Sequence, residues 1–184
     1  MGLFNFWKKP SAPRTPDAAD SAKAESDPLS SADAGSTQID REHFVLHVPF
    51  QWVAVPGDNP LEFEFRNQTL REQLIVTVLL TQQPADAATR RSMAERLASL
   101  RLRGLDTLSN GRAVHSPVKF QTGSDQAEAR CAGRDDANKV RFAFVIRATA
   151  TKVVTVALTR YFLEEVGAPF DAYAGLIFDL VQVK

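Results

Sequence analysis

The three histidines are the first residues to test for a metal or catalytic site. His43 and His47 are four residues apart, a spacing at which two histidines on a helix can share a metal ion. The surrounding sequence alternates like a strand, however, and four strand residues place the two backbones about 13 Å apart. His115 lies on another predicted strand. Since Cys-x-x-Cys and His-Glu-x-x-His patterns are also absent, the sequence predicts no metal site.

Cys131 is the only cysteine and therefore the only candidate thiol nucleophile. A Cys–His mechanism would need a histidine beside it in the fold, for example His115. A lone cysteine in a strand is more commonly a small buried side chain. The Gly-x-Ser-x-Gly, P-loop and Gly-x-Gly-x-x-Gly patterns are absent, so nothing indicates a serine hydrolase or a phosphate cradle. We expect no enzyme activity and no cofactor. An enzyme or small-molecule binder with a site scattered in sequence is the alternative.

A group of arginines within residues 86–105 is the one concentration of positive charge that could contact phosphates or an acidic protein. Acidic residues interrupt it, beginning with Asp86 and Glu95, and no aromatic residues are interleaved. The whole chain balances 22 basic against 22 acidic residues. We therefore interpret the group as a solvated helix face and expect no nucleic-acid partner. Its members are Arg90, Arg91, Arg96, Arg101 and Arg103.

The N-terminal peptide, residues 1–9, holds the clearest candidate binding residues. Phe4, Phe6 and Trp7 are large apolar side chains, and Lys8 and Lys9 follow them directly. Aromatic residues beside cations suit docking on a protein or contact with an anionic membrane surface. A peptide this short is too small to form a stable free helix, so any helix would form on binding. Docking on protein, contact with membrane, and no role all stay open.

Residues 10–39 predict a disordered linker. The segment contains four prolines with many Ser, Ala and Asp residues, and Leu29 is nearly its only large apolar side chain. Such a composition cannot bury enough surface to offset its ordering entropy. The linker would tether residues 1–9 with a reach of about 30 Å. Residues 40–184 then form a single domain. No apolar run approaches the roughly 18 residues of a membrane span, and the order of residues 1–9 differs from a secretory signal, so we expect a cytoplasmic location.

Hydrophobic periodicity predicts the elements of that domain. Period-two alternation is typical of strands, and apolar residues spaced three and four apart are typical of helices. One such stripe is Met93, Leu97, Leu100 and Gly104, and another begins at Phe170 and runs to Val181. The resulting fold class is α+β, an antiparallel sheet of about six to seven strands flanked by helices. The expected strands are 43–48, 61–65, 74–81, 113–121, 126–132, 139–148 and 152–162, and the expected helices are 86–105 and one from about 169.

A short motif adds a family resemblance. At Phe44-Val45-Leu46-His47-Val48-Pro49-Phe50-Gln51-Trp52 an apolar strand runs into a proline and then a tryptophan. In this the chain resembles the PsbP-like superfamily, which includes DcrB-like bacterial proteins and the Eag chaperones of type VI secretion. The resemblance covers residues 42–184 and implies an α/β/α sandwich. It also implies a binding or chaperone role without catalysis, and it supplies no functional residue.

The function expected from the sequence is a non-catalytic protein-binding module, an adaptor or chaperone of a bacterial type. The partner would be another protein contacted through an exposed sheet face or strand edge, with residues 1–9 as a tethered docking peptide. Peripheral membrane association through the same peptide is a further alternative. A near-neutral chain has little colloidal repulsion, which favours association, and the sequence leaves the oligomeric state open.

Overall fold

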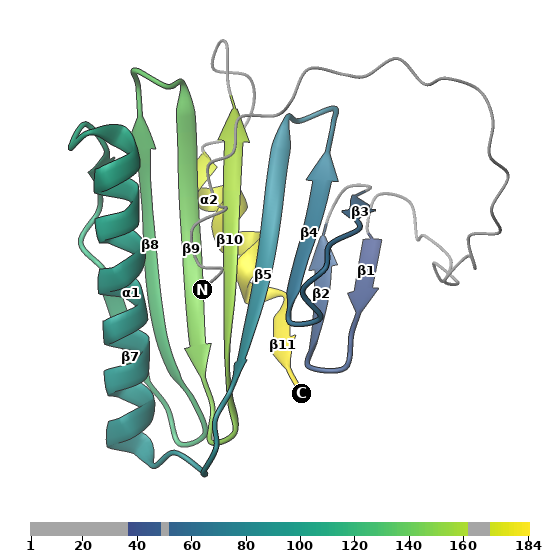
Figure 1. The fold of residues 1–184 in the computed structure, drawn as a ribbon, viewed down its shortest axis with the longest axis vertical. Coiled ribbons are helices and arrows are strands. Elements are labelled where there is room, and N and C mark those ends of the chain that lie inside the picture. Colours follow the sequence, from purple (N-terminus) through teal and green to yellow (C-terminus); the bar gives the residue numbers. More distant parts are fainter. Residues whose placement is uncertain (1–36, 49–51, 162–169) are drawn as a thin grey trace, which may run out of the picture. The chain divides into compact units, whose positions relative to one another are not determined.

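The computed structural model describes residues 37–48, 52–161 and 170–184, and within them the chain forms two antiparallel sheets and two helices (Figure 1). The larger sheet has eight strands in the order β3-β4-β5-β10-β9-β8-β6, with β7 also paired to β8. This confirms the predicted α+β class. Its strands are β3 Val53–Val55, β4 Glu62–Asn67, β5 Glu72–Leu80, β6 Val114–His115, β7 Lys119–Thr122, β8 Ala127–Asp135, β9 Val140–Ala148 and β10 Lys152–Tyr161.

The smaller sheet has three strands in the order β1-β2-β11. Its strands are β1 Thr37–Asp40, β2 Phe44–Val48 and β11 Val181–Val183. β1 starts within the segment expected to be linker. Residues 43–48 were expected to form the first strand of a single sheet. Most of them form β2, which is the central strand of this second sheet. Phe44, Leu46 and Val48 are fully buried there, as their alternation predicted.

The hairpin of β9 and β10 is the centre of the larger sheet and is buried on both faces. Val156 pairs with Val145 and Val154 with Arg147, so these side chains share one face. By alternation, Phe142 and Phe144 of β9 point to the opposite face. Continuous burial of both strands follows because each face of the sheet is covered.

The first helix, α1 Ala87–Ser109, covers one face of the sheet by packing on β8 and β9 (Figure 1). It starts where the Asp86 carboxylate accepts a hydrogen bond from the Thr89 amide at 2.7 Å, a standard N-cap. It ends at Asn110 and Gly111, whose φ angles of 53° and 72° are left-handed. Asn and Gly tolerate that conformation best. The helix expected at residues 86–105 is present, and it is longer than expected because it continues to Ser109.

The second helix, α2 Phe170–Asp179, covers the other face together with the small sheet. Phe170, Tyr173 and Ile177 join Val154 and Val156 in one hydrophobic cluster, which confirms the predicted helical cover. The prediction that Val181 continues this helix was wrong, because Val181 begins β11 and pairs with Leu46. Neither helix in the described ranges is long and apolar enough to cross a membrane.

A buried arginine holds the end of α2 and β11 against the larger sheet. Arg147 donates from Nε to Glu128 at 2.8 Å and from Nη2 to the Phe178 carbonyl at 3.0 Å. It also donates to the Val181 carbonyl. The carbonyls at a helix C-terminus lack partners within the helix, so this cation satisfies one of them and fixes where the chain changes from helix to strand.

Sequence reasoning placed one strand at residues 113–121, and the structure divides that segment into β6 and β7. Pro117 lies between them and has no amide to donate to β8. The Ser116 amide still donates to the Ala132 carbonyl at 2.9 Å. The segment therefore follows the edge of β8 in two pieces.

Candidate functional site: a groove beside the first helix

The candidate binding residues named from the sequence lie outside the part of the chain that the structure describes. Phe4, Phe6, Trp7, Lys8 and Lys9 all precede residue 37, where the description begins. A binding role for these residues therefore stays a prediction.

The described histidines do not assemble a metal site. His43 lies 4.0 Å from Glu42, while His115 is exposed and contacts the Ser116 carbonyl at 3.0 Å through Nδ1. Across the described residues no cluster of three or more His, Cys, Asp and Glu side chains is placed to hold an ion. His47 lies in β2, which begins one residue after His43.

Cys131 does not form the Cys–His pair considered as an alternative. Its side chain is buried at 4% exposure, and its thiol lies 3.3 Å from the Ser116 carbonyl and 4.0 Å from the Ser116 hydroxyl. Burial raises the pKa of the Cys131 thiol, so the thiolate is disfavoured. The thiol is thus buried and hydrogen-bonded to Ser116, which lies between β6 and β7 and whose carbonyl His115 also contacts.

Arg90 and Arg91, two of the five arginines named from the sequence, make contacts within the described residues. Arg90 is buried and donates to the carbonyls of Ala85 and Ser124 at 3.1 and 2.7 Å. Arg91 forms an ion pair with Glu95 at 2.9 Å. Both side chains thus stabilise α1 and its surroundings.

The apolar stripe of α1 is turned away from the centre of the contact with the sheet. The buried helix residues are small or near the ends, chiefly Ala94, Ala98 and Leu105. Small residues at this contact let the helix lie close to β8 and β9. Met93 and Leu97 are only half-buried, and Leu100 is 40% exposed. The stripe therefore faces the space between α1 and the ends of β5 and β10.

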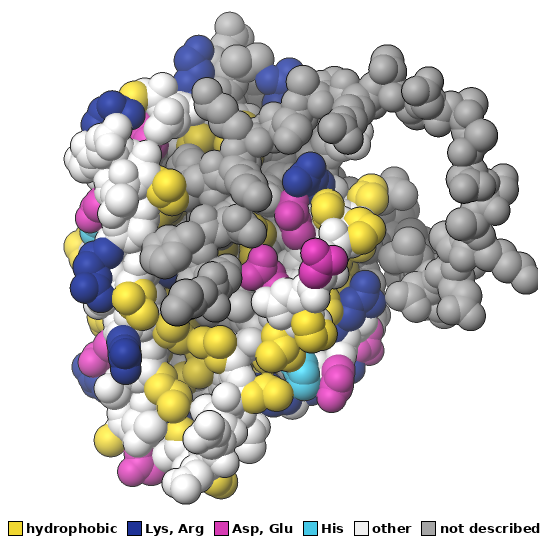
Figure 2. All heavy atoms as spheres, viewed as in Figure 1, with side chains coloured by type: hydrophobic (Ala, Val, Ile, Leu, Met, Phe, Trp, Pro, Cys, Tyr) yellow, Lys and Arg dark blue, Asp and Glu magenta, His cyan; other side chains and the backbone are white. Residues whose placement is uncertain are grey.

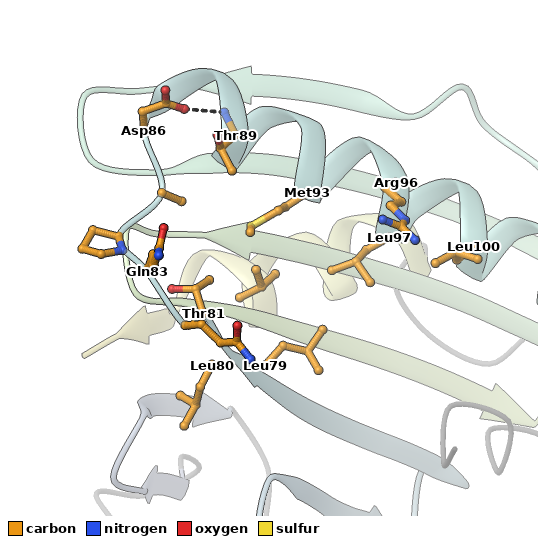
Figure 3. Close-up of a pocket in the computed structure, with 14 residues that line it drawn as sticks. Leu79, Leu80, Thr81, Gln83, Asp86, Thr89, Met93, Arg96, Leu97 and Leu100 are labelled. Carbon is orange, nitrogen blue, oxygen red and sulfur yellow. Dashed lines mark hydrogen bonds between the residues drawn. The ribbon is translucent and has the colours of Figure 1, made fainter.

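That space is a groove of about 940 Å³. The close-up shows Met93, Leu97 and Leu100 on the helix side and Leu79 from the end of β5 opposite them, while the Leu80 side chain points away from the helix (Figure 3). Val153 at the start of β10 and the turn from Thr81 to Ala85 also line the groove. Figure 2 shows hydrophobic side chains gathered on this face between α1 and β5. Leu79 and Leu80 are 39% and 55% exposed.

The chemistry of the groove suits binding better than catalysis. Eight of its fourteen lining residues are apolar. The polar ones are Thr81, Gln82 and Gln83 of the connecting turn, Thr89 of α1, and the charged residues Asp86 and Arg96. The Asp86 carboxylate is engaged by the Thr89 amide, and hydrogen bonds to Thr89 lower its pKa. Arg96 carries a permanent positive charge at neutral pH. The lining thus offers apolar contact and one cation, without a nucleophile beside a base.

Sequence reasoning found one wall of this groove without recognising the groove itself. The stripe at Met93, Leu97 and Leu100 was identified, but its spacing does not show whether a sheet or solvent lies opposite. Leu79 and Leu80 were included in a continuously apolar strand. The available signal was Leu79, because alternation along β5 places it on the face opposite Val78 and Leu80, and it is 39% exposed at the strand end.

Comparisons with known proteins do not assign the chain to a family. No family model and no curated protein matches it. Among solved structures it is similar to a protein from Bacteroides thetaiotaomicron, with 13% identity and a TM-score of 0.40 over 77% of this chain. It is also similar to the Ran-binding protein Mog1p of Saccharomyces cerevisiae, with 11% identity and a TM-score of 0.48 over 80% of this chain and 95% of Mog1p.

The chain spans 45% of the Bacteroides protein. At these identities and TM-scores, neither likeness carries an argument about function. The resemblance to the PsbP-like superfamily likewise stays a prediction. The functional interpretation therefore depends on the groove.

Proposed function

We propose that this protein is a non-catalytic protein-binding module, an adaptor or chaperone, and that the groove between α1 and the ends of β5 and β10 is its contact surface. The observation that carries the proposal is the convergence of Leu79, Met93, Leu97 and Leu100 on one surface groove. Single exposed leucines are ordinary on protein surfaces, whereas contiguous apolar surface marks interaction sites.

Burying these leucines on a partner would stabilise the complex. Full burial of a leucine side chain is worth roughly 1.5–3 kcal/mol. Leu79 and Leu100 keep 39% and 40% of their surface accessible, so each has on the order of 1 kcal/mol left to contribute. Apart from Arg96, the polar side chains of the groove lie in the connecting turn and at the start of α1, and the two facing walls are apolar, which favours apolar side chains of another protein as its occupant. A cytoplasmic location belongs to the same proposal.

Site-specific photo-crosslinking tests the proposal in the full-length protein. A photoreactive amino acid is introduced at Leu100, which lines the groove, or at Leu108, which is on the same helix but is not among the groove-lining residues. The two positions are matched, at 40% and 43% exposure. In the native cells, we expect a discrete protein adduct from position 100 and none from position 108. Equal adducts at both positions, or none at either, would contradict the proposal.

A further inference from the structure

The apolar wall of the groove also presents an arginine. Arg96 is exposed, lines the groove, and has no ion-pair partner among the described residues. We propose that the occupant of the groove is an acidic amphipathic segment of a partner protein, whose apolar side chains contact the leucines and whose carboxylate pairs with Arg96. This inference rests on the proposed function and names the chemistry of its partner.

The position of Arg96 places its charge beside the apolar contacts. Residues three and four apart lie on the same side of a helix, so Arg96 is next to Met93 on one turn and Leu100 on the following turn. The close-up shows its guanidinium beside Leu97 (Figure 3). A ligand that contacts these apolar side chains therefore brings its own polar edge close to this cation.

The acidic residue of the groove does not neutralise Arg96. Asp86 caps the helix through the Thr89 amide, where its negative charge is favourable for the helix dipole. Ten residues of helix separate Asp86 from Arg96, about 15 Å along the axis. At that distance two exposed charges are largely screened at physiological ionic strength. The cation is thus available to an incoming carboxylate.

The length of the apolar wall indicates a segment of protein as the ligand. Met93 to Leu100 spans two helical turns, about 10 Å, and Leu79 lies on the facing wall. A helix laid in such a groove contacts it through residues spaced i, i+3 or i+4, and i+7. Two turns of contact accommodate these anchors, with one acidic side chain at the edge of the apolar face.

Charge also argues against this chain's own residues 1–9 as the occupant. That peptide carries Lys8 and Lys9 next to its aromatic side chains. Bound in the groove, it would bring like charge toward Arg96, which is unfavourable. A partner with carboxylates at that position is the complementary choice.

Two designed peptides test the inference against the full-length protein. Each has about 15 residues, with leucines at i, i+3, i+4 and i+7 spacing, and carries either glutamates or lysines at the edge of the apolar face. Fluorescence anisotropy measures both affinities. We expect the wild-type protein to bind the glutamate peptide about threefold more tightly, the scale of an exposed ion pair. Arg96→Glu should reverse the order, while Lys119→Glu, at an exposed position in β7, should preserve it.

The leucine variants separate failure of the charge inference from failure of the groove itself. Leu100→Glu should weaken both peptides, and Leu108→Glu should weaken neither. If Leu100→Glu weakens both peptides but Arg96→Glu leaves their order unchanged, the acidic partner is overturned and the groove stands. If Leu100→Glu has no effect on either peptide, the groove and the proposed function both fall.

Two other results would assign the groove to a different occupant. Replacing Phe4, Phe6 and Trp7 by Ala in the full chain should leave the peptide affinities unchanged; a rise of about tenfold for both peptides would overturn the inference in favour of the chain's own peptide. Concentration-dependent dimerisation that Leu100→Glu abolishes would overturn it in favour of a second copy.

Discussion

Arg147 places a permanent positive charge between β9 and the C-terminal elements. Its side chain is 9% exposed, and its partners are the Glu128 carboxylate and the carbonyls of Phe178 and Val181. A charge taken out of water is tolerated when it is paired and its donors are satisfied. Arg147 therefore ties β11 and the end of α2 to the larger sheet.

Replacing Arg147 by Met should destabilise the protein by about 3–5 kcal/mol, because the change leaves a buried carboxylate with one fewer partner and buried carbonyls without a donor. Urea unfolding followed by circular dichroism measures the loss. Arg91→Met is the matched control, since Arg91 also pairs with a glutamate but is 57% exposed. The control should cost about 0.5 kcal/mol or less. Similar losses for both variants would contradict this account of Arg147.

The same cluster predicts a dependence of stability on pH. Burial raises the pKa of the Glu128 carboxyl, but hydrogen bonds from Arg130 and Arg147 outweigh it and hold the pKa below the ordinary 4.5. A carboxyl with a lowered folded-state pKa contributes stability above 4.5, and this contribution is lost as pH falls through the folded-state value. Burial raises the pKa of Glu72, which acts in the opposite direction.

The Glu128→Gln variant isolates this contribution, because Glu72 is common to both proteins. We expect the variant to be less stable at neutral pH and the difference from wild type to shrink as pH falls below 4.5. Unfolding free energies measured at several pH values give the two curves. A constant difference across that range would show that Glu128 does not supply the linkage.

At the scale of elements, the edge of the larger sheet depends on a glycine. A Cβ at Gly133 would lie 2.5 Å from the Phe142 ring, 2.5 Å from the Val114 carbonyl and 2.8 Å from the His115 Cβ. β6 therefore approaches β8 more closely than any side chain at this position allows. The absence of a side chain, and not a special backbone angle, is what this position requires.

Gly133→Ala should displace β6 from β8 and cost about 1–3 kcal/mol, the typical range for overpacking. Gly57→Ala is the matched control, since a Cβ there meets nothing within 4 Å. It should leave the free energy of unfolding unchanged or slightly raised, because Ala restricts the unfolded chain. Thermal and urea unfolding check both variants. Equal stability of the two proteins would show that the edge adjusts without strain.

At the scale of the whole molecule, the first question is whether residues 1–36 contribute to the stability of the folded part. Among the described residues, buried side chains from both sheets and α2 form one hydrophobic cluster. We predict that deleting residues 1–36 leaves the free energy of unfolding unchanged within about 0.5 kcal/mol, because the deleted composition predicts disorder. Urea unfolding of both lengths measures this. A loss of several kcal/mol would show that the N-terminal segment contributes to the folded core.

Membrane contact is the second question for residues 1–9. Aromatic side chains beside lysines suit the interface of an anionic bilayer, so we predict that the full-length protein floats with phosphatidylserine vesicles. Changing Phe4, Phe6 and Trp7 to Ala should abolish flotation, while the variant retains its folded-state spectrum. Equal flotation of the two proteins would dispose of this role.

Much of the fold was predictable because the signals are local. Alternation over β2, β4, β9 and β10 and the helical spacing of α1 and α2 follow from which side chains must leave water. Turn residues and caps mark several ends, as Asn110 and Gly111 do for α1. Val181 shows the limit, since its apolar character fits a helix and a strand equally, and only the edge of β2 decided between them.

The sequence by itself determined the α+β class, the main helices, and the absence of recognised catalytic motifs. The tertiary structure decided that Met93, Leu97 and Leu100 face a groove, because periodicity shows that residues share a face but not what lies opposite it. It also decided that Leu79, which precedes the helix, forms the other wall. A binding surface made of two elements arises from their packing, and its free energy depends on contacts that no single stretch of sequence contains.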